Sequence, residues 1–398
     1  MYEMVIMGVL ILLLVGLGGA EYAYHRRNLN SIPIRIHVNG TRGKSSVTRL
    51  IAAGLRESGM RAFAKTTGTL PRMIFHDGTE YPVYRHSRPN IIEQVRIIAF
   101  AARYAAEALV IECMALQPYL QSLCERTLVR STLGVITNVR EDHLDVMGPE
   151  EGDVARSLLG TTPAGTTLFT CEWDYPEEFE AACRLRDSDL VVISREEIAS
   201  LGEEVMARFT YVEHRENVAL ALRVCESLGV NRETALRGMT KAVPDPGSMS
   251  DLRLDFFGRL IYFVNGFAAN DPESTEMIWR MALDRHGDVE SKIMIINSRI
   301  DRPERSRQMG NALASWPRAD RYILIGSGSY FVERYAARAG VETRFFTNAE
   351  DLGTDIIFEE ILKHCGRKTL VIGIGNIAGP GLELATYFKN RSEPLPRT

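Results

Sequence analysis

The sequence predicts a mainly parallel α/β protein with two successive domains, preceded by one transmembrane helix. Short apolar strands alternate with amphipathic helices, which is typical of parallel sheets with ligand sites at the carboxyl ends of their strands. A stretch containing two prolines and a glycine, residues 243–247, interrupts this alternation and resembles an interdomain hinge. Near the N-terminus, residues 4–20 form a long run without any charge.

This N-terminal run has the composition of a membrane anchor. About 17 apolar residues are the shortest stretch that crosses the hydrocarbon core. The only charge before the run is Glu3, so the basic start of a secretory signal is missing. A histidine and two arginines follow at residues 25–27. The positive-inside rule therefore predicts a single-pass anchor, residues 1–28, in the cell membrane with the remaining chain cytoplasmic. A buried helix of a soluble domain is the alternative.

The overall charge argues against a nucleic-acid partner. The formal net charge is -4 and the sequence pI is about 6.1, so the chain lacks the basic surplus that binds phosphate backbones. The six cysteines are scattered without a CxxC pair. We expect reduced thiols in a cytosolic protein and no structural zinc site.

Residues 31–242 are expected to form the first domain, built on a mainly parallel sheet. Residues 34–38 alternate apolar and polar side chains, as a strand does, and residues 44–57 carry an apolar stripe at helical spacing. Apolar strands follow at residues 108–111 and 133–136. Residues 248–398 should form a smaller Rossmann-like domain, with strands at residues 260–264, 293–296, 322–325 and 370–374.

A glycine-containing loop, Asn39-Gly40-Thr41-Arg42-Gly43-Lys44-Ser45-Ser46, joins the first predicted strand to its helix. Glycines allow backbone N–H groups to surround phosphate oxygens, and the helix N-terminus adds a positive dipole. Lys44 can neutralise the β- and γ-phosphates, while the Ser45 hydroxyl can bind Mg²⁺. Val38 stands where the usual P-loop has its first glycine. The loop predicts an ATP site, with a chance match as the alternative.

Acidic residues follow two neighbouring predicted strands. Glu112 is the first polar residue after the strand at residues 109–111, and a carboxylate at that edge is a natural magnesium ligand. The segment 137–145, Thr-Asn-Val-Arg-Glu-Asp-His-Leu-Asp, also follows a buried strand. Its acidic residues and His143 can hold a cation or polarise a carboxyl group. A surface glutamate and a solvated acidic turn are the alternatives.

The order of these three motifs resembles the Mur ligase superfamily of ATP-dependent amide-forming enzymes, over most of residues 34–390. The resemblance implies that residues 39–46 hold the phosphates of ATP, and that Lys44, Glu112 and His143 are catalytic. Ser45 and Glu112 would bind one Mg²⁺, and His143 with Glu112 would serve a second. It further implies nucleotide contacts by Asn217, and by Asp301 and Arg302 on a loop that closes over ATP.

Two departures from the family pattern make the resemblance more specific. Only about 30 residues precede the first strand, too few for the domain that binds a UDP-sugar in cell-wall ligases. No lysine lies between Lys65 and Lys241, so the carbamoylated lysine of many relatives is missing. The membrane helix, the short-form loop Gly40 to Ser46, the segment Lys65 to Arg72 and the lack of a UDP-sugar domain are together most similar to the ligase subunits of bacterial poly-gamma-glutamate capsule synthases. Implied partners are glutamate, the growing polymer and a membrane subunit of the synthase complex, with a homo-oligomer left open.

The expected reaction is formation of a gamma-glutamyl amide through an acyl phosphate, with release of ADP and phosphate. Arginines in nearby loops could hold substrate carboxylates by bidentate pairing, with a plain surface role as the equal alternative; they are Arg72, Arg85, Arg88 and Arg140. The segment Asn270 to Ser274 resembles a loop of the family's last domain. Two alternatives stay open: a membrane-bound P-loop ATPase that powers or regulates polymer export, and a ligase like folylpolyglutamate synthase.

Overall fold

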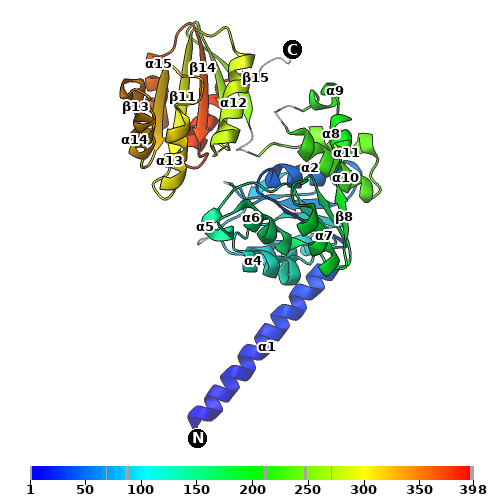
Figure 1. The fold of residues 1–398 in the computed structure, drawn as a ribbon. Helices are drawn as coiled ribbons and strands as arrows, with labels where there is room; N and C mark the ends of the chain where they lie inside the picture. Colours follow the sequence, from blue (N-terminus) through cyan, green and yellow to red (C-terminus); the bar gives the residue numbers. More distant parts are fainter. Residues whose placement is uncertain are drawn as a thin grey trace. The chain divides into compact units, whose positions relative to one another are not determined.

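The computed structural model describes residues 2–68, 70–85, 89–209, 211, 213–245, 249–269 and 271–394. It contains two compact units, Met1–Phe209 with Glu213–Val243 and Thr210–Val212 with Pro244–Thr398. We describe each unit separately (Figure 1). Four residues named above, Arg88, Pro246, Gly247 and Asn270, lie outside the described ranges.

The first unit is built on an eight-stranded sheet with the order β4-β3-β2-β5-β1-β6-β7-β8. Strands β2, β5, β1, β6, β7 and β8 run parallel, whereas β3 and β4 form an antiparallel edge. The strand bounds are β1 Ile34–Asn39, β2 Ala62–Lys65, β3 Arg72–Ile74, β4 Glu80–Pro82, β5 Ala108–Glu112, β6 Leu133–Ile136, β7 Thr167–Thr170 and β8 Asp189–Val192.

Helices within residues 44–240 cover both faces of this sheet, and the amphipathic ones among them bury an apolar stripe. On one face, α2 packs so closely on α11 that a Cβ on Gly238 would lie 2.4 Å from the carbonyl oxygen of Ala53. The helices are α1 Tyr2–Asn30, α2 Lys44–Glu57, α3 Glu93–Arg103, α4 Pro118–Leu123, α5 Leu144–Met147, α6 Glu151–Leu158, α7 Pro176–Leu185, α8 Arg195–Ala199, α9 Glu203–Met206, α10 Arg215–Ser227 and α11 Arg232–Thr240. A π-helical turn η1, Cys124–Val129, and a 3-10 turn η2, Leu159–Thr161, complete the unit.

Helix α1 projects from the first unit as a single rod (Figure 1). It has 29 residues, which corresponds to about 43 Å of α-helix. Its apolar part is exposed and is long enough to cross a membrane. Only its C-terminal turns are buried, at His25, Asn28 and Leu29. The predicted apolar N-terminal helix is therefore confirmed as a helix of membrane-spanning length.

The second unit is a seven-stranded sheet with the order β13-β12-β11-β14-β10-β9-β15. Its five strands from β13 to β10 are parallel, and β9 and β15 are antiparallel. The strand bounds are β9 Ser250–Phe256, β10 Arg259–Asn265, β11 Ser291–Ser298, β12 Arg321–Gly326, β13 Phe346–Asn348, β14 Lys368–Gly375 and β15 Glu393–Pro394. All four strands predicted here are present, whereas the hairpin partner β9 was not predicted.

Helices flank the second sheet, and the sheet separates two apolar cores, one on each of its faces. They are α12 Pro272–Arg285, α13 Pro303–Ala312, α14 Tyr330–Arg338, α15 Thr354–Lys363 and α16 Pro380–Lys389, with a 3-10 turn η3 Thr343–Phe345. Both units thus have the mainly parallel α/β architecture predicted from the alternation of strands and helices.

Candidate functional site

The three predicted motifs of the first unit meet at the carboxyl edge of its sheet. Strand β1 lies between β5 and β6 and runs parallel to both. In the strand register, Val38 lies opposite Glu112 and Asn39 lies opposite Ile136. The loop at residues 39–46 therefore emerges beside Glu112 and beside the segment that begins at Thr137.

Direct hydrogen bonds join the glycine loop to the segment after β6. The backbone N–H of Thr41 donates to the carbonyl of Asn138 at 3.1 Å, and that of Arg42 donates to the Asn138 side-chain oxygen at 3.0 Å. The Thr137 hydroxyl donates to the carbonyl of Arg42 at 2.5 Å. These bonds fix the conformation of the loop. They pair the backbone N–H groups of residues 41 and 42, and the carbonyl of residue 42, with the segment after β6.

Two glycines are required by the conformation and by the neighbours of the loop. Gly40 has φ of 132°, and a Cβ there would lie 2.0 Å from the hydroxyl oxygen of Thr137. Gly43 has φ of 78°, and a Cβ there would lie 2.6 Å from the side-chain oxygen of Asn217. A side chain is disfavoured at both positions. The Asn217 amide, on α10, is thereby packed against the loop.

Lys44 begins helix α2 and folds over the loop. Its ammonium donates to the carbonyls of Gly40 at 2.5 Å and of Thr41 at 3.3 Å. The first turn of α2 contains no acidic residue, so the positive end of the helix dipole is uncompensated there. A lysine and a helix N-terminus converging on a glycine loop form an anion site suited to phosphates.

Ser45 and Glu112 form the pair of oxygen ligands expected for a divalent cation. The Ser45 hydroxyl donates to Oε2 of Glu112 at 2.9 Å, and the backbone N–H of Thr67 donates to the same oxygen at 2.7 Å. The Glu112 residue is 2% exposed. Magnesium prefers oxygen ligands and commonly takes one or two from the protein and others from phosphates and water. The residues present fit a phosphate-bound Mg²⁺.

His143 lies in the segment after β6 with its backbone in the left-handed region, at φ of 49°. Its Nε2 is 3.9 Å from a carboxylate oxygen of Asp142, and the other oxygen of Asp142 is 3.9 Å from the Arg42 guanidinium. Among the described residues, no group of three or more His, Cys, Asp and Glu side chains could hold a metal ion. A joint ligand role of His143 with Glu112 remains a prediction.

Asn39 supports the loop from below instead of facing its open side. Its residue is 2% exposed, and its side-chain amide donates to Gln121 at 2.7 Å and to the Thr161 hydroxyl at 3.1 Å. Gln121 in turn donates to the Ser157 hydroxyl at 2.8 Å. This buried network ties the end of β1 to the helices beneath it. The predicted phosphate contact of the Asn39 side chain conflicts with this placement.

The sequence reasoning missed a buried ion-pair network beside Glu112. Lys65 ends strand β2 with a fully buried side chain whose ammonium is 2.7 Å from Glu93 on α3. Arg85 donates to both oxygens of Glu93, at 2.5 and 3.0 Å. Arg85 is thus paired inside the protein, contrary to the expectation that it holds a substrate carboxylate. The signal was the charge of Lys65 directly after the apolar residues 62–64.

Electrostatics couple this network to the candidate metal ligand. Burial lowers the pKa of Lys65, while the carboxylates of Glu93 and Glu112 act in the opposite direction. Burial raises the pKa of Glu93. The hydrogen bond from Arg85 and the charge of Lys65 lower it by more than burial raises it, so the net pKa is below its usual value. The network therefore links the charges of Lys65, Arg85 and Glu93, and the charge of Lys65 in turn interacts with Glu112.

A second missed carboxylate, Glu172, orients the segment after β6. It follows β7 and is 4% exposed. One of its oxygens accepts from the Val139 backbone N–H at 2.7 Å and from Arg140 at 3.2 Å. The Arg140 side chain is nevertheless about half exposed, at 51%. Glu172 therefore fixes the backbone of this segment and leaves Arg140 accessible.

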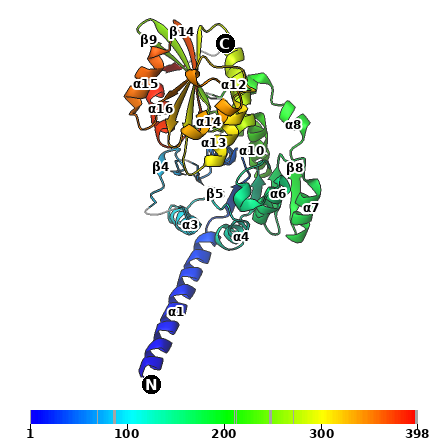
Figure 2. The same cartoon turned by 60° about the vertical axis from the view of Figure 1, so that its left-hand side comes forward.

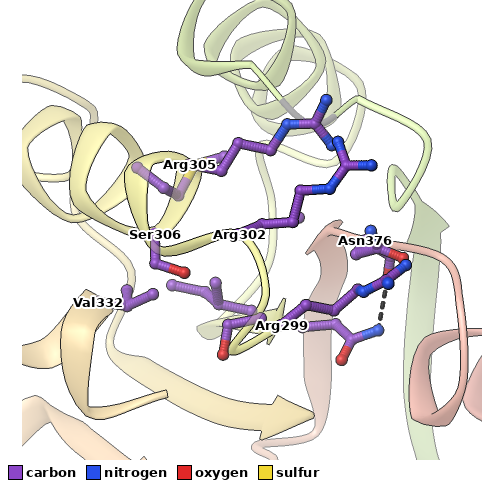
Figure 3. Close-up of a pocket in the computed structure, with 11 residues that line it drawn as sticks. Arg299, Arg302, Arg305, Ser306, Val332 and Asn376 are labelled. Atoms are coloured by element: carbon purple, nitrogen blue, oxygen red, sulfur yellow. Dashed lines mark hydrogen bonds between the residues drawn. The ribbon is translucent and has the colours of Figure 1, made fainter. Parts of the chain in front are cut away.

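The second unit has a pocket at the carboxyl end of β11 (Figure 3). Its lining contains Arg299, Arg302 and Arg305 and no acidic residue. Figure 3 shows the head groups of Arg302 and Arg305 side by side. Asp301 accepts two hydrogen bonds from Arg299, at 2.9 and 2.6 Å, and this contact lowers its pKa. Within this unit, Arg302 therefore lines a pocket without acidic residues, whereas Asp301 is engaged with Arg299.

Comparisons with known proteins agree with this combination of fold and site. Residues 38–199 match the Mur ligase middle domain, and residues 252–391 match the poly-gamma-glutamate synthase CapB C-terminal domain. The structure resembles E. coli FolC in complex with DHPP and ADP, with a TM-score of 0.67, 13% identity and 93% of each chain covered. At that identity the likeness shows the fold alone.

Two relatives match along almost the whole chain. The capsule biosynthesis protein CapB of Bacillus anthracis is 38% identical over 94% of this chain and 80% of its own length. PGA synthase CapB of Bacillus subtilis strain 168 is 35% identical over 94% of this chain and 95% of its own length.

A phosphate loop beside a buried carboxylate, on a sheet that matches the Mur ligase middle domain, defines the class of ATP-dependent amide-bond-forming ligases. ATP and a divalent metal ion are the cofactors of this class. The chain belongs to the CapB family of poly-gamma-glutamate synthases.

Proposed function

We propose that the first unit phosphorylates the terminal carboxylate of a poly-gamma-glutamate chain, and that glutamate then displaces the phosphate to extend the polymer. The observation that carries this proposal is the hydrogen bond between Ser45 and Glu112 beside the glycine loop. This contact supports the proposal, because transfer of a γ-phosphoryl group requires oxygen ligands for Mg²⁺ close to the loop that binds the phosphates.

The side chains of the site divide the task. Lys44 and the N-terminus of α2 attract the phosphates and offset negative charge that develops during transfer. Ser45 and Glu112 would hold Mg²⁺, which supplies charge neutralisation between the phosphates. Asn217 lies against Gly43 and would position the nucleotide from α10. His143 would orient the reacting carboxylate or a second metal ion from the segment after β6.

The remaining arginines of the site would recognise the polyanionic substrate. Arg140 is half exposed beside the loop, and Arg72 lies at the start of β3 on the same edge of the sheet. A guanidinium pairs well with the free carboxylate that each gamma-linked glutamate carries. Arg302 in the second unit would contact ATP by the resemblance stated above, and its pocket is suited to an anion.

The proposed location is the cell membrane, with α1 as a single-pass anchor and both units in the cytoplasm. The charges at residues 25–27 favour this orientation. Anchoring would keep the ligase near a membrane subunit of a capsule synthase, which receives the polymer, by raising the effective concentration at that site. Self-association of the chain is compatible with this arrangement.

Coupled product analysis tests the proposal. With ATP, Mg²⁺, a gamma-glutamyl primer and labelled glutamate, ADP should appear in proportion to glutamate incorporated. Lys44→Ala should abolish both, because it removes the phosphate-binding ammonium. The matched control Lys389→Ala, at the end of α16 in the second unit, should keep both. ADP release that does not depend on glutamate or primer would refute the ligase mechanism. It would support the alternative of a P-loop ATPase that powers or regulates polymer export.

A further inference from the structure

The membrane helix and the nucleotide loop lie at opposite ends of strand β1. Helix α1 ends at Asn30, and β1 runs from Ile34 to Asn39, where the loop begins. A strand of six residues spans about 20 Å. The loops that precede the parallel strands share the amino edge of the sheet, and α1 leaves from this edge (Figure 1).

The last turns of α1 are fixed to the first unit. His25 Nε2 lies 2.9 Å from the carbonyl oxygen of Leu128 in η1. Leu29 is 2% exposed in an apolar cluster with Val129, and its carbonyl accepts a hydrogen bond from Arg35 at 3.0 Å. Helix α3 packs beside α1 as well (Figure 2). The amino edge of the sheet therefore lies at a fixed position along the axis of α1.

With α1 inserted in a bilayer, the amino edge of the sheet lies at the level of the lipid headgroups. The uncharged run ends at Ala20, five residues before His25, which is about 7.5 Å along a helix. The polar layer on each side of the hydrocarbon core is about 5–8 Å thick. Between these points Tyr22 and Tyr24 are 57% and 59% exposed, as in the aromatic belts of membrane proteins. Once α1 is inserted, η1 lies at headgroup depth.

Arginines gather around this root of α1. We call five of them the basic rim; they are Arg26, Arg27, Arg103, Arg126 and Arg130. All are exposed except Arg26, which is partly buried. Among the described residues, none of the five forms an ion pair with a carboxylate. Exposed arginines elsewhere do form such pairs, as Arg208 does with Glu233 and Arg237 with Glu57.

The rim is also electrostatically crowded, although the chain as a whole carries a formal charge of -4. Arg35 donates to the carbonyl of Arg130 at 3.0 and 2.9 Å. Burial lowers the pKa of Arg35; the charge of Glu125 opposes this shift, and the positive charge of Arg26 adds to it. Partial burial lowers the pKa of Arg186, the charge of Arg126 lowers it further, and Glu125 again acts in the opposite direction. The positive charges of Arg26 and Arg126 thus repel neighbouring arginines, and Glu125 offsets part of this repulsion.

We propose that the basic rim binds the headgroups of anionic phospholipids in the leaflet next to the first unit. The proposal rests on the membrane placement proposed above. Charge complementarity and matching depth favour lipid as the occupant, because anionic headgroups attract arginines near the surface of a membrane. Binding at the rim would hold the amino edge on the membrane and keep the nucleotide loop at the distant edge of the sheet, open to substrates from the cytoplasm.

Hydrogen–deuterium exchange of the full chain in lipid nanodiscs tests this proposal. One set of discs contains only phosphatidylcholine, and the other contains a third of phosphatidylglycerol. We expect amides at residues 123–130 to exchange about tenfold more slowly in the anionic discs. High salt should remove the difference, because it screens exposed charges. Equal exchange in both discs overturns the proposal.

Charge reversal supplies the control. The double variant R126E/R130E should lose the lipid-dependent protection, whereas R334E/R338E, the same change on exposed α14 of the second unit, should keep it. Arg27→Glu leaves η1 unaltered and should also weaken the protection. It therefore tests the proposal even where the double variant folds poorly. Protection that persists in both the double variant and Arg27→Glu overturns the proposal.

Two further outcomes separate this proposal from others. Protection of residues 123–130 by soluble poly-gamma-glutamate in phosphatidylcholine discs, without any lipid effect, would assign the rim to the product and overturn the lipid proposal. A chain that does not enter discs refutes the membrane placement and this proposal together. A chain that enters them, with exchange independent of lipid charge, refutes this proposal alone and leaves the ligase function intact.

Discussion

Ser45 donates a hydrogen bond to Glu112 across 2.9 Å, although 67 positions separate the two residues in the chain. The contact exists because β1 and β5 are neighbouring parallel strands, so that the loop after one meets the last residue of the other. Since Glu112 is buried and a hydroxyl is its partner, the pair can exchange this hydrogen bond for a metal ion.

Ser45→Ala is expected to raise the Mg²⁺ concentration required for half-maximal activity by about tenfold, because one oxygen ligand is lost. The fold should survive, since Glu112 keeps its bond from Thr67. Magnesium titrations of glutamate incorporation measure the effect. Ser58→Ala, at the other end of α2, is the matched control and should titrate like the unaltered protein; a Ser45 variant with that same profile would contradict the metal role.

Gly43→Ala should abolish nucleotide binding. The left-handed conformation costs about 1–2 kcal/mol for a residue with a side chain, and the new Cβ would also lie 2.6 Å from the Asn217 oxygen. Gly59→Ala isolates the first effect, since its φ is 94° and no atom lies within 4 Å of the added Cβ. Calorimetric titration with a nonhydrolysable ATP analogue should detect binding by Gly59→Ala only. Equal affinities would show that Asn217 does not limit the loop.

Lys65→Met should destabilise the first unit by about 3 kcal/mol, because removal of one partner leaves the other charge of a buried pair uncompensated. Arg85 remains bound to Glu93, so the loss should lie at the lower end of the roughly 3–5 kcal/mol that breaking a buried ion pair costs. Urea unfolding followed by tryptophan fluorescence measures it. Lys368→Met breaks an exposed pair with Asp288 and should change little. Similar losses in both variants would argue against the buried network.

The periodicity of the sequence was sufficient to predict the central strands and the edge on which the site lies. Strands β5 and β6 are apolar apart from the final Glu112, β1 ends in Asn39, and Thr137 follows β6, so hydrophobicity and the rules of parallel sheets determine where Glu112 emerges. The short strands β3 and β4 at the edge of the first sheet, and the antiparallel strand β9 of the second, escaped prediction. They form hairpins with the strands next to them in the chain, and their stability depends on packing in the folded sheet, which local patterns do not encode.

Burial explains why the site was predicted only in part. Asn39 and Arg85 look like ligands in sequence because both are polar and lie near the motifs, yet each is engaged by another side chain, Gln121 and Glu93 respectively. Conversely, no role was predicted for the charges of Lys65 and Glu172. Their roles arise from contacts between different strands and helices, and these depend on three-dimensional packing.

His37 offers a test in which the pH dependence has a defined sign. It is fully buried within β1, and its Nδ1 lies 2.8 Å from Glu125. Burial lowers its pKa, but its interactions with Cys113, Cys124 and Glu125 outweigh burial, so the net pKa is raised well above 6.5. A raised folded-state pKa contributes stability that is complete below the unfolded value and is lost as the pH rises through the folded value.

The free-energy difference between the unaltered protein and His37→Gln should therefore be largest at pH 6 and should shrink as the pH rises above 6.5 toward the raised folded-state pKa. Urea unfolding of both proteins at a series of pH values measures this difference. His364→Gln is the control, because burial lowers the pKa of His364 and its contribution cannot decline in the same window. A pH-independent difference for His37→Gln would mean that the imidazole is neutral in the folded protein, and that Glu125 is held by Ser131, which already donates two hydrogen bonds to it.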